Sequence, residues 1–210
     1  MTPPPTLLID SGTHGDEAEI IPFIQRALKK YRSQLPPYLY IREVSPSAVR
    51  RATRMNGEGF DLNRVFYDGS PSREVQSLIH LLTPHRFSLG VSFHMDLIND
   101  AFYLYDSGNF LGHPILEKFQ SELEHHGVSL LSGVDDPDDS VLGDTYSRGY
   151  PVHPPSKMHP DDKTMWSWLL THGVARRLLM PEIPGTMTME QKAFIVDATF
   201  LHLIRPLSTL

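Results

Sequence analysis

Residues 9–17 read IDSGTHGDE, and they join a short apolar run to an amphipathic stretch. The apolar run, residues 6–10, predicts a short buried strand. Residues 17–31 carry apolar side chains on one broad face at helical spacing, which predicts a helix. A strand that leads through a glycine-containing turn into a helix is typical of α/β proteins. This stretch therefore sets the expected fold class, and it places His14 and Glu17 three positions apart where the helix begins.

The same alternation of apolar runs and amphipathic stretches continues along the chain. Further strands are predicted at residues 38–44, 89–94, 101–105 and 176–183, and further helices at residues 72–82, 114–126, 160–172 and 189–204. Residues 46–66 and 133–158 lack periodicity and are expected to be long loops. No boundary divides this pattern, so we expect one α/β domain over residues 1–210, with a single sheet covered by helices on both faces.

The composition restricts the classes of partner. The 210 residues include 19 Lys plus Arg and 25 Asp plus Glu, for a formal net charge of -6, so neither a nucleic acid nor an anionic membrane is an expected partner. The absence of cysteine excludes thiolate metal ligands and disulfides. We see no signal peptide and no apolar run of the roughly 18 residues that a membrane span needs, so a cytoplasmic location is expected.

His14 and Glu17 are candidate metal ligands. An imidazole and a carboxylate at this spacing can converge on one cation, each at about 2.0–2.2 Å. The carboxyl ends of strands are also where open α/β folds place their sites. The apolar strand VSFHMD, residues 91–96, presents His94 as a third ligand. The alternatives are an acidic first helical turn for Glu17 and a hydrogen-bonded core position for His94.

Residues 54–66, RMNGEGFDLNRVF, bring two arginines and two asparagines into one irregular segment. A planar guanidinium offers a fork of donors that matches a carboxylate, so arginine beside asparagine suits the terminal carboxylate of a substrate. Arg64 could instead pair with a neighbouring acidic residue at the surface. Arg50 or Arg51 could take the place of Arg54 if the loop is shifted.

The apolar strand LLMPEIP, residues 178–184, contains a lone carboxylate, Glu182, between two prolines. Packing explains a glutamate there poorly, whereas a role as general base explains it well. A second acidic segment lies in the preceding long loop and could bind calcium, although its interruption by a proline is more typical of a solvated turn: Asp135, Asp136, Asp138 and Asp139.

In their order along the chain, these segments resemble the motifs of the zinc metallocarboxypeptidase superfamily, which includes the succinylglutamate desuccinylase and aspartoacylase branch. The resemblance rests on His14-x-x-Glu17, the block from Arg54 to Phe66 with its Asp-Leu-Asn-Arg core, His94 and Glu182. It covers residues 14–182, and the Asp-Leu-Asn-Arg core is highly specific. It implies a mixed, twisted sheet flanked by helices.

The resemblance also implies a role for each of eight residues. One zinc ion would be held by His14, Glu17 and His94, with Asp61 orienting the first histidine. The remaining four residues would act on the substrate: Glu182 as general base, Arg54 in polarising the scissile carbonyl, and Asn63 with Arg64 in gripping the terminal carboxylate.

The reaction that follows is hydrolysis of an amide bond, most simply to release a C-terminal amino acid from a small peptide. The alternatives are deacylation of an N-acyl amino acid and a non-catalytic relative that binds carboxylates. Only 28 residues of this sequence follow Glu182 (210 minus 182), too few for the C-terminal β-domain usual in the aspartoacylase branch, so a peptide substrate is expected. Peptidases of this superfamily usually carry a tyrosine on a loop before the general base, and Tyr146 and Tyr150 both lie in the matching loop.

Overall fold

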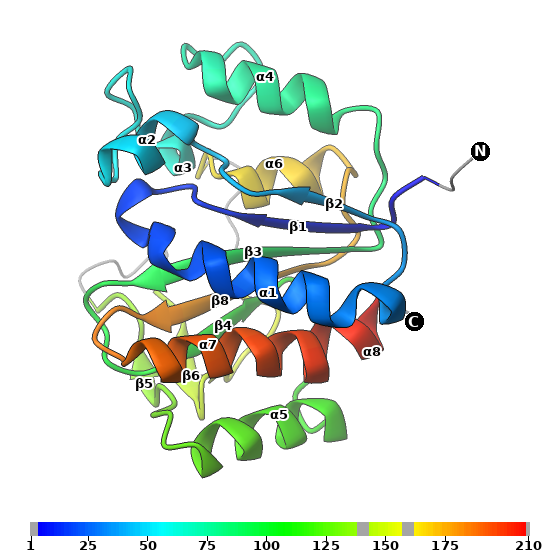
Figure 1. Ribbon diagram of the computed structural model, residues 1–210, viewed down its shortest axis with the longest axis vertical. Helices are drawn as coiled ribbons and strands as arrows, with labels where there is room; N and C mark the ends of the chain where they lie inside the picture. Colours follow the sequence, from blue (N-terminus) through cyan, green and yellow to red (C-terminus); the bar gives the residue numbers. More distant parts are fainter. Residues whose placement is uncertain (1–3, 138–142, 157–161, 209–210) are drawn as a thin grey trace.

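A five-stranded sheet forms the centre of the computed structural model, which describes residues 4–137, 143–156 and 162–208 (Figure 1). Its strands lie in the order β2-β1-β3-β8-β4. Their bounds are β1 (Leu7–Ser11), β2 (Tyr38–Ile41), β3 (Leu89–Asp96), β4 (Tyr103–Asp106) and β8 (Leu178–Pro184). The first four strands in that order are parallel, whereas β4 pairs antiparallel with β8. The predicted α/β fold with a mixed sheet is therefore confirmed.

Helices cover both faces of this sheet (Figure 1). One face carries α1 (Ile21–Tyr31), α5 (Pro114–His125) and α7 (Met189–Ala198), and α7 continues as a π-helical segment, η3 (Thr199–Ile204), and α8 (Arg205–Leu207). The other face carries α4 (Arg73–Leu82) and α6 (Met165–Thr171), with the short helices α2 (Pro46–Arg51) and α3 (Leu62–Val65) nearby. Two 3-10 segments, η1 (Gly15–Ile20) and η2 (Arg32–Gln34), flank α1. None of the described helices combines the length and apolar character that crossing a membrane requires.

The alternating direction of strand side chains divides the core into two clusters. In β1, Leu7 and Ile9 belong to the cluster that contains α1 and α7, whereas Leu8 belongs to the cluster that contains α4 and α6. None of these three side chains is exposed to solvent. Burial of each stabilises the fold by about 1.5–3 kcal/mol. A strand segment covered on both faces is apolar at consecutive positions, which is why residues 6–10 predict β1 without alternation, although its last residues, Asp10 and Ser11, are polar and buried.

The two segments expected to be loops contain short elements. Helix α2 lies within residues 46–66; the Ser45 side chain accepts the Ala48 N–H at its start, and Ala52 ends it in the left-handed conformation. Residues 133–158 contain a three-stranded sheet formed by β5 (Gly133–Val134), β6 (Thr145–Ser147) and β7 (Tyr150–Pro151). Elements this short do not complete a hydrophobic period, so the sequence pattern did not predict them.

The helix predicted for residues 160–172 is shorter than expected. Helix α6 begins at Met165, where the Thr164 side chain accepts the Ser167 N–H as N-cap. Residues 160 and 161 lie outside the described part of the chain, as do Asp138 and Asp139 of the candidate calcium segment.

Helix α2 packs against η1, the segment that follows His14, and Gly15 lies at this contact. A Cβ atom on Gly15 would stand 1.9 Å from the carbonyl oxygen of Ala48. Because that oxygen belongs to the backbone, we expect Gly15→Ala to lower the free energy of unfolding by about 2–3 kcal/mol, measured by urea denaturation. Gly69→Ala is the matched control: Gly69 has φ +81° with nothing within 4 Å, so only the left-handed backbone is strained, at about 1 kcal/mol. Equal losses in the two variants would show that the contact between α2 and η1 is not tight.

Candidate metal centre and active-site cleft

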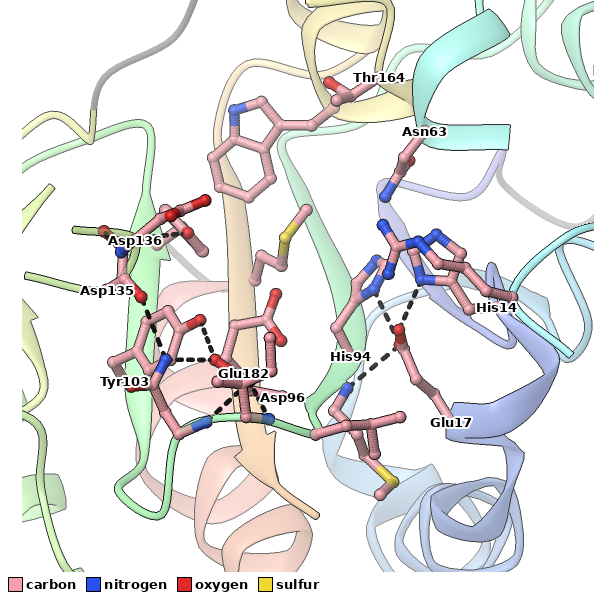
Figure 2. A pocket seen from close by; sticks show the side chains of 18 of the residues that line it. His14, Glu17, Asn63, His94, Asp96, Tyr103, Asp135, Asp136, Thr164 and Glu182 are labelled. Carbon is pink, nitrogen blue, oxygen red and sulfur yellow. Dashed lines mark hydrogen bonds and ion pairs between the residues drawn. The ribbon is translucent and has the colours of Figure 1, made fainter. Parts of the chain in front are cut away.

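The residues singled out in the sequence meet at the carboxyl ends of the parallel strands (Figure 2). His14 follows β1, and Glu17 lies in η1. His94 and Glu182 lie near the ends of β3 and β8, directly opposite one another in the parallel register. Parallel strands bring their carboxyl ends to one edge of the sheet, so side chains distant in sequence converge there.

His14, Glu17 and His94 form a compact and buried group. The Nδ1 atom of His14 lies 2.5 Å from Oε1 of Glu17, and the Nδ1 atom of His94 lies 3.0 Å from Oε2. One potential ligand atom from each residue falls within 4.8 Å of the others, and no second group of this kind occurs among residues 4–137, 143–156 and 162–208. Two imidazoles and a carboxylate are a donor set found at catalytic zinc sites. The side chains present therefore fit such an ion.

Mutual contact shifts the pKa values in this group. Burial by itself lowers the pKa of His14, but hydrogen bonds to Asp61 and Glu17 outweigh it and raise the pKa to about 9. Burial by itself raises the pKa of Glu17, but His94 and His14 lower it to about 2. Glu17 is therefore an anion at neutral pH. The two Nδ1 atoms beside it can hold either a proton or a metal ion, so the two compete.

A chain of hydrogen bonds holds the ring of His14 from its other side. The Nε2 atom of His14 lies 3.0 Å from Oδ1 of Asp61. The second oxygen of Asp61 accepts the Nε–H of Arg54 at 2.9 Å, and Oδ1 also accepts the backbone N–H of Asn63 at 2.9 Å. Because a carboxylate occupies Nε2, the Nδ1 atom of His14 is directed toward Glu17.

The structure distinguishes between the alternatives for the arginines. Arg54 and Arg64 line the cleft together with Asn63, whereas Arg50 and Arg51 of α2 do not. Arg64 forms no ion pair with any carboxylate of the described residues, and its Nη1 donates to the carbonyl oxygen of Asn63 at 2.8 Å. A surface ion-pair network for Arg64 is therefore not observed.

Glu182 stands in β8, between the group of His14, Glu17 and His94 and the rest of the cleft (Figure 2). It is 9% exposed, and among the described residues no hydrogen-bond donor pairs with its carboxylate. Burial raises the pKa of Glu182 to about 8; His94 opposes this shift, and the negative charge of Glu17 adds to it. A desolvated carboxylate with a raised pKa can accept and release a proton near neutral pH.

The cleft has a volume of about 620 Å³, within the range of sites for small ligands. Its wall beyond Glu182 includes side chains that the sequence analysis did not select, chiefly Tyr103 and Tyr105 of β4 and Trp166 of α6. The pattern YLYD at residues 103–106 carries a usable signal, because alternate residues of a strand share a face. Tyr103 is also directly opposite Glu182 in the antiparallel pairing of β4 with β8.

Neither tyrosine considered from the sequence lines the cleft. Tyr150 donates its hydroxyl to Asp106 and accepts the backbone N–H of Phe110, both at 2.7 Å. Tyr146 is buried behind the cleft wall, with its ring against the rings of Tyr103 and Tyr105. The tyrosines that face the cleft therefore come from β4 rather than from the predicted loop.

Comparison of the sequence with protein-family profiles and with curated proteins gives no match. The fold, in contrast, is similar to solved structures of metallopeptidases. A candidate metallopeptidase of Shewanella denitrificans OS217 superposes with a TM-score of 0.73 at 19% identity, over 100% of this chain and 78% of that chain. The murein-tripeptide amidase MpaA of Escherichia coli O157 superposes with a TM-score of 0.57 at 19% identity, over 93% of this chain and 81% of that chain. A metallo-carboxypeptidase of Pseudomonas aeruginosa, in complex with (2-guanidinoethylmercapto)succinic acid, superposes with a TM-score of 0.63 at 17% identity. This match covers 94% of this chain and 56% of that chain.

The chain therefore shares the fold of these solved metallopeptidases and of the amidase, as the resemblance of its motifs predicts.

Proposed function

We propose that this protein is a zinc-dependent amide hydrolase that releases a C-terminal amino acid from a small peptide. The observation that carries this proposal is the convergence of two imidazole Nδ1 atoms on the Glu17 carboxylate, with Glu182 on the adjacent strand opposite His94. A catalytic metal and a general base must lie side by side for hydrolysis of an unactivated amide. The metallopeptidases and the amidase that share this fold support the same class of reaction.

His14, Glu17 and His94 would hold the metal ion, and Asp61 would keep the His14 ring in the ligating orientation. When bound, zinc supplies Lewis-acid chemistry, which polarises a carbonyl oxygen and acidifies a coordinated water. The choice of zinc follows from the resemblance in sequence motifs, because two histidines and a glutamate also accept other divalent ions.

Glu182 would act as the general base. Its carboxylate would take a proton from the attacking water and later return it to the departing amine. The raised pKa of Glu182, about 8, suits a group that both gains and loses a proton at neutral pH.

Arg54, Asn63 and Arg64 would bind the substrate. Arg54 keeps donors available after its Nε–H bonds to Asp61, since a guanidinium carries five N–H groups. These donors would stabilise negative charge that develops on the carbonyl oxygen. Asn63 and Arg64, which also line the cleft, would hold the terminal carboxylate of the peptide.

A substrate comparison tests this proposal. Purified protein supplied with zinc is assayed on short peptides with a free C-terminus, on the same peptides with an amidated C-terminus, and on N-acetyl and N-succinyl amino acids. We expect hydrolysis of the free-carboxyl peptides, loss of this activity with a chelator, and recovery when zinc is added back. Preferred cleavage of the N-acyl amino acids would make the protein a deacylase instead, and cleavage of none of the three sets would contradict a hydrolase.

A further inference from the structure

The two sides of the cleft differ in charge. The metal-ligand side carries the guanidinium groups of Arg54 and Arg64 and the amide of Asn63. The opposite side, beyond Glu182, includes Asp135 and Asp136 (Figure 2). A ligand that spans the cleft would therefore meet donors at one end and acceptors at the other.

Carboxylates outnumber the cations that can neutralise them. Within residues 4–137, 143–156 and 162–208, seven carboxylates and two guanidinium groups line the cleft, and no lysine of these residues does. A divalent metal at the ligand group would offset two of the negative charges, and the two arginines would offset two more. The excess that is left attracts positively charged ligands, and the low-dielectric walls of a cleft strengthen this attraction.

The tyrosines of β4 add acceptors rather than donors to the acidic side. Tyr103 donates its hydroxyl hydrogen to Oδ2 of Asp96 at 2.6 Å, and Tyr105 donates its own to Oδ2 of Asp135. Each phenol has one proton to donate, and that proton is already used. The two phenolic oxygens can still accept hydrogen bonds from a ligand through their lone pairs. This suits a ligand group that is rich in N–H donors.

The Asp135 carboxylate is held in place by the protein. Its Oδ1 accepts the backbone N–H of Asp136 at 2.9 Å and of Asp144 at 2.7 Å. Asp135 is buried, whereas Asp136 is exposed, and no described side chain pairs with the Asp136 carboxylate. The acidic side thus combines a fixed carboxylate with one that is available to a ligand.

Aromatic rings lie on the same side of the cleft. Tyr103, Tyr105 and Trp166 all line it, and each is largely buried. A cationic group over the face of such a ring is attracted to its π electrons. Carboxylates together with aromatic rings are the combination that recognises an ammonium or guanidinium group.

The described acids on this side of the cleft form no group with metal-ligand spacing. Among the described residues the one group with metal-ligand spacing is His14, Glu17 and His94, and it contains no aspartate. The buried Glu182 carboxylate, which faces the cleft without a donor from the described residues, also needs a partner of positive or donor character.

We infer that the substrate carries a cationic side chain, an amino or guanidino group, on the amino acid that is released. This rests on the proposed function. The α-carboxylate lies toward Asn63 and Arg64, and the cationic group lies against Tyr105, Asp135 and Asp136.

Isosteric substrates test this inference. N-acylated dipeptides ending in arginine are compared with the same peptides ending in citrulline, which has nearly the same shape without the charge. Peptides ending in lysine and norleucine form a second pair. Because a hydrogen bond to a charged group contributes about 1.5–3 kcal/mol, kcat/KM is expected to favour the charged member at least about tenfold. Equal or reversed values in both pairs would overturn the inference.

Asp136→Asn probes the acidic side without disturbing a described contact. We expect it to lower the ratio of arginine to citrulline kcat/KM about two- to fivefold, as for a solvent-accessible ion pair. The matched control is Glu190→Gln, which removes the same charge from an exposed position outside the cleft and should leave the ratio unchanged. Equal changes in the two variants would show that net charge, and not the cleft, sets the preference.

Calorimetric binding of free arginine and citrulline to the zinc-supplied protein separates this inference from the proposed function. If no peptide is cleaved but arginine binds more tightly than citrulline, and Asp136→Asn weakens that preference, the proposed hydrolase function is wrong and the inferred cation-binding site is supported. If peptides are cleaved without a charge preference, the hydrolase stands and the cation site is wrong. If no peptide is cleaved and arginine binds no more tightly than citrulline, both the proposed function and the cation site are overturned.

Discussion

Replacing Glu182 with glutamine is expected to reduce kcat/KM for peptide hydrolysis about 10²- to 10⁴-fold, with the metal content unchanged. The amide that replaces the carboxylate has nearly the same volume but cannot accept a proton from water. Glu182 is not one of the three residues that form the metal-ligand group, so its loss should affect proton transfer rather than metal binding. The measurement is a steady-state assay together with elemental analysis of the same preparation.

Glu190→Gln serves as the matched control, because it makes the same chemical change at an exposed position in the first turn of α7. It should retain full activity. Glu182→Gln is also expected to be more stable than the wild type, because burying a neutral amide costs less than burying an ionisable carboxyl group. Unchanged activity in Glu182→Gln would contradict the assigned base, whatever its stability.

Arg54→Ala is expected to lower kcat about 10²- to 10³-fold, as for loss of a donor that stabilises an oxyanion. The change in kcat should exceed the change in KM, because charge on the carbonyl oxygen develops only in the transition state. Arg54→Lys keeps the positive charge but loses the planar fork, so it should recover part of this activity at most.

The contact between Arg54 and Asp61 complicates this experiment, because Asp61 also holds His14. Loss of Arg54 could therefore act through the metal site instead of the substrate. Metal content separates the two: full metal with low kcat supports a direct role, whereas metal loss in proportion to the loss of activity would rule that role out. Arg50→Ala, on the same segment but outside the cleft, is the control and should behave as the wild type.

The parts of the fold that could be predicted are those in which burial imposes a long or continuous pattern. Leu7, Leu8 and Ile9 of β1 are apolar on both faces because helices cover both, and α1 carries an apolar face against the cluster that contains Leu7 and Ile9. Helices α2 and α3 escaped prediction because four to six residues do not complete an amphipathic repeat. Their signals are local instead: Ser45 and Asp61 each cap a helix, and Asp61 does so while it also contacts His14.

The candidate site divides in the same way. The ligand group could be predicted because His14 and Glu17 are neighbours on one turn and His94 ends an apolar strand. The position of His94 directly opposite Glu182 could not be predicted, because the register between β3 and β8 depends on tertiary structure. The acidic side of the cleft is assembled from β4, α6 and the segment around Asp135, which are distant in sequence and share no motif. Tyr103 and Tyr105 could have been predicted to share one face of the sheet, because they are alternate residues of an edge strand.

Metal content of the purified protein tests the central claim most directly. Wild type, His14→Ala and the exposed-histidine control His125→Ala are supplied with zinc, dialysed and measured by elemental analysis. We predict about one equivalent of zinc in the wild type and in His125→Ala, as for a single catalytic site, and little or none in His14→Ala. No metal in any of the three proteins, or equal metal in all three, would contradict a metal centre formed by His14, Glu17 and His94.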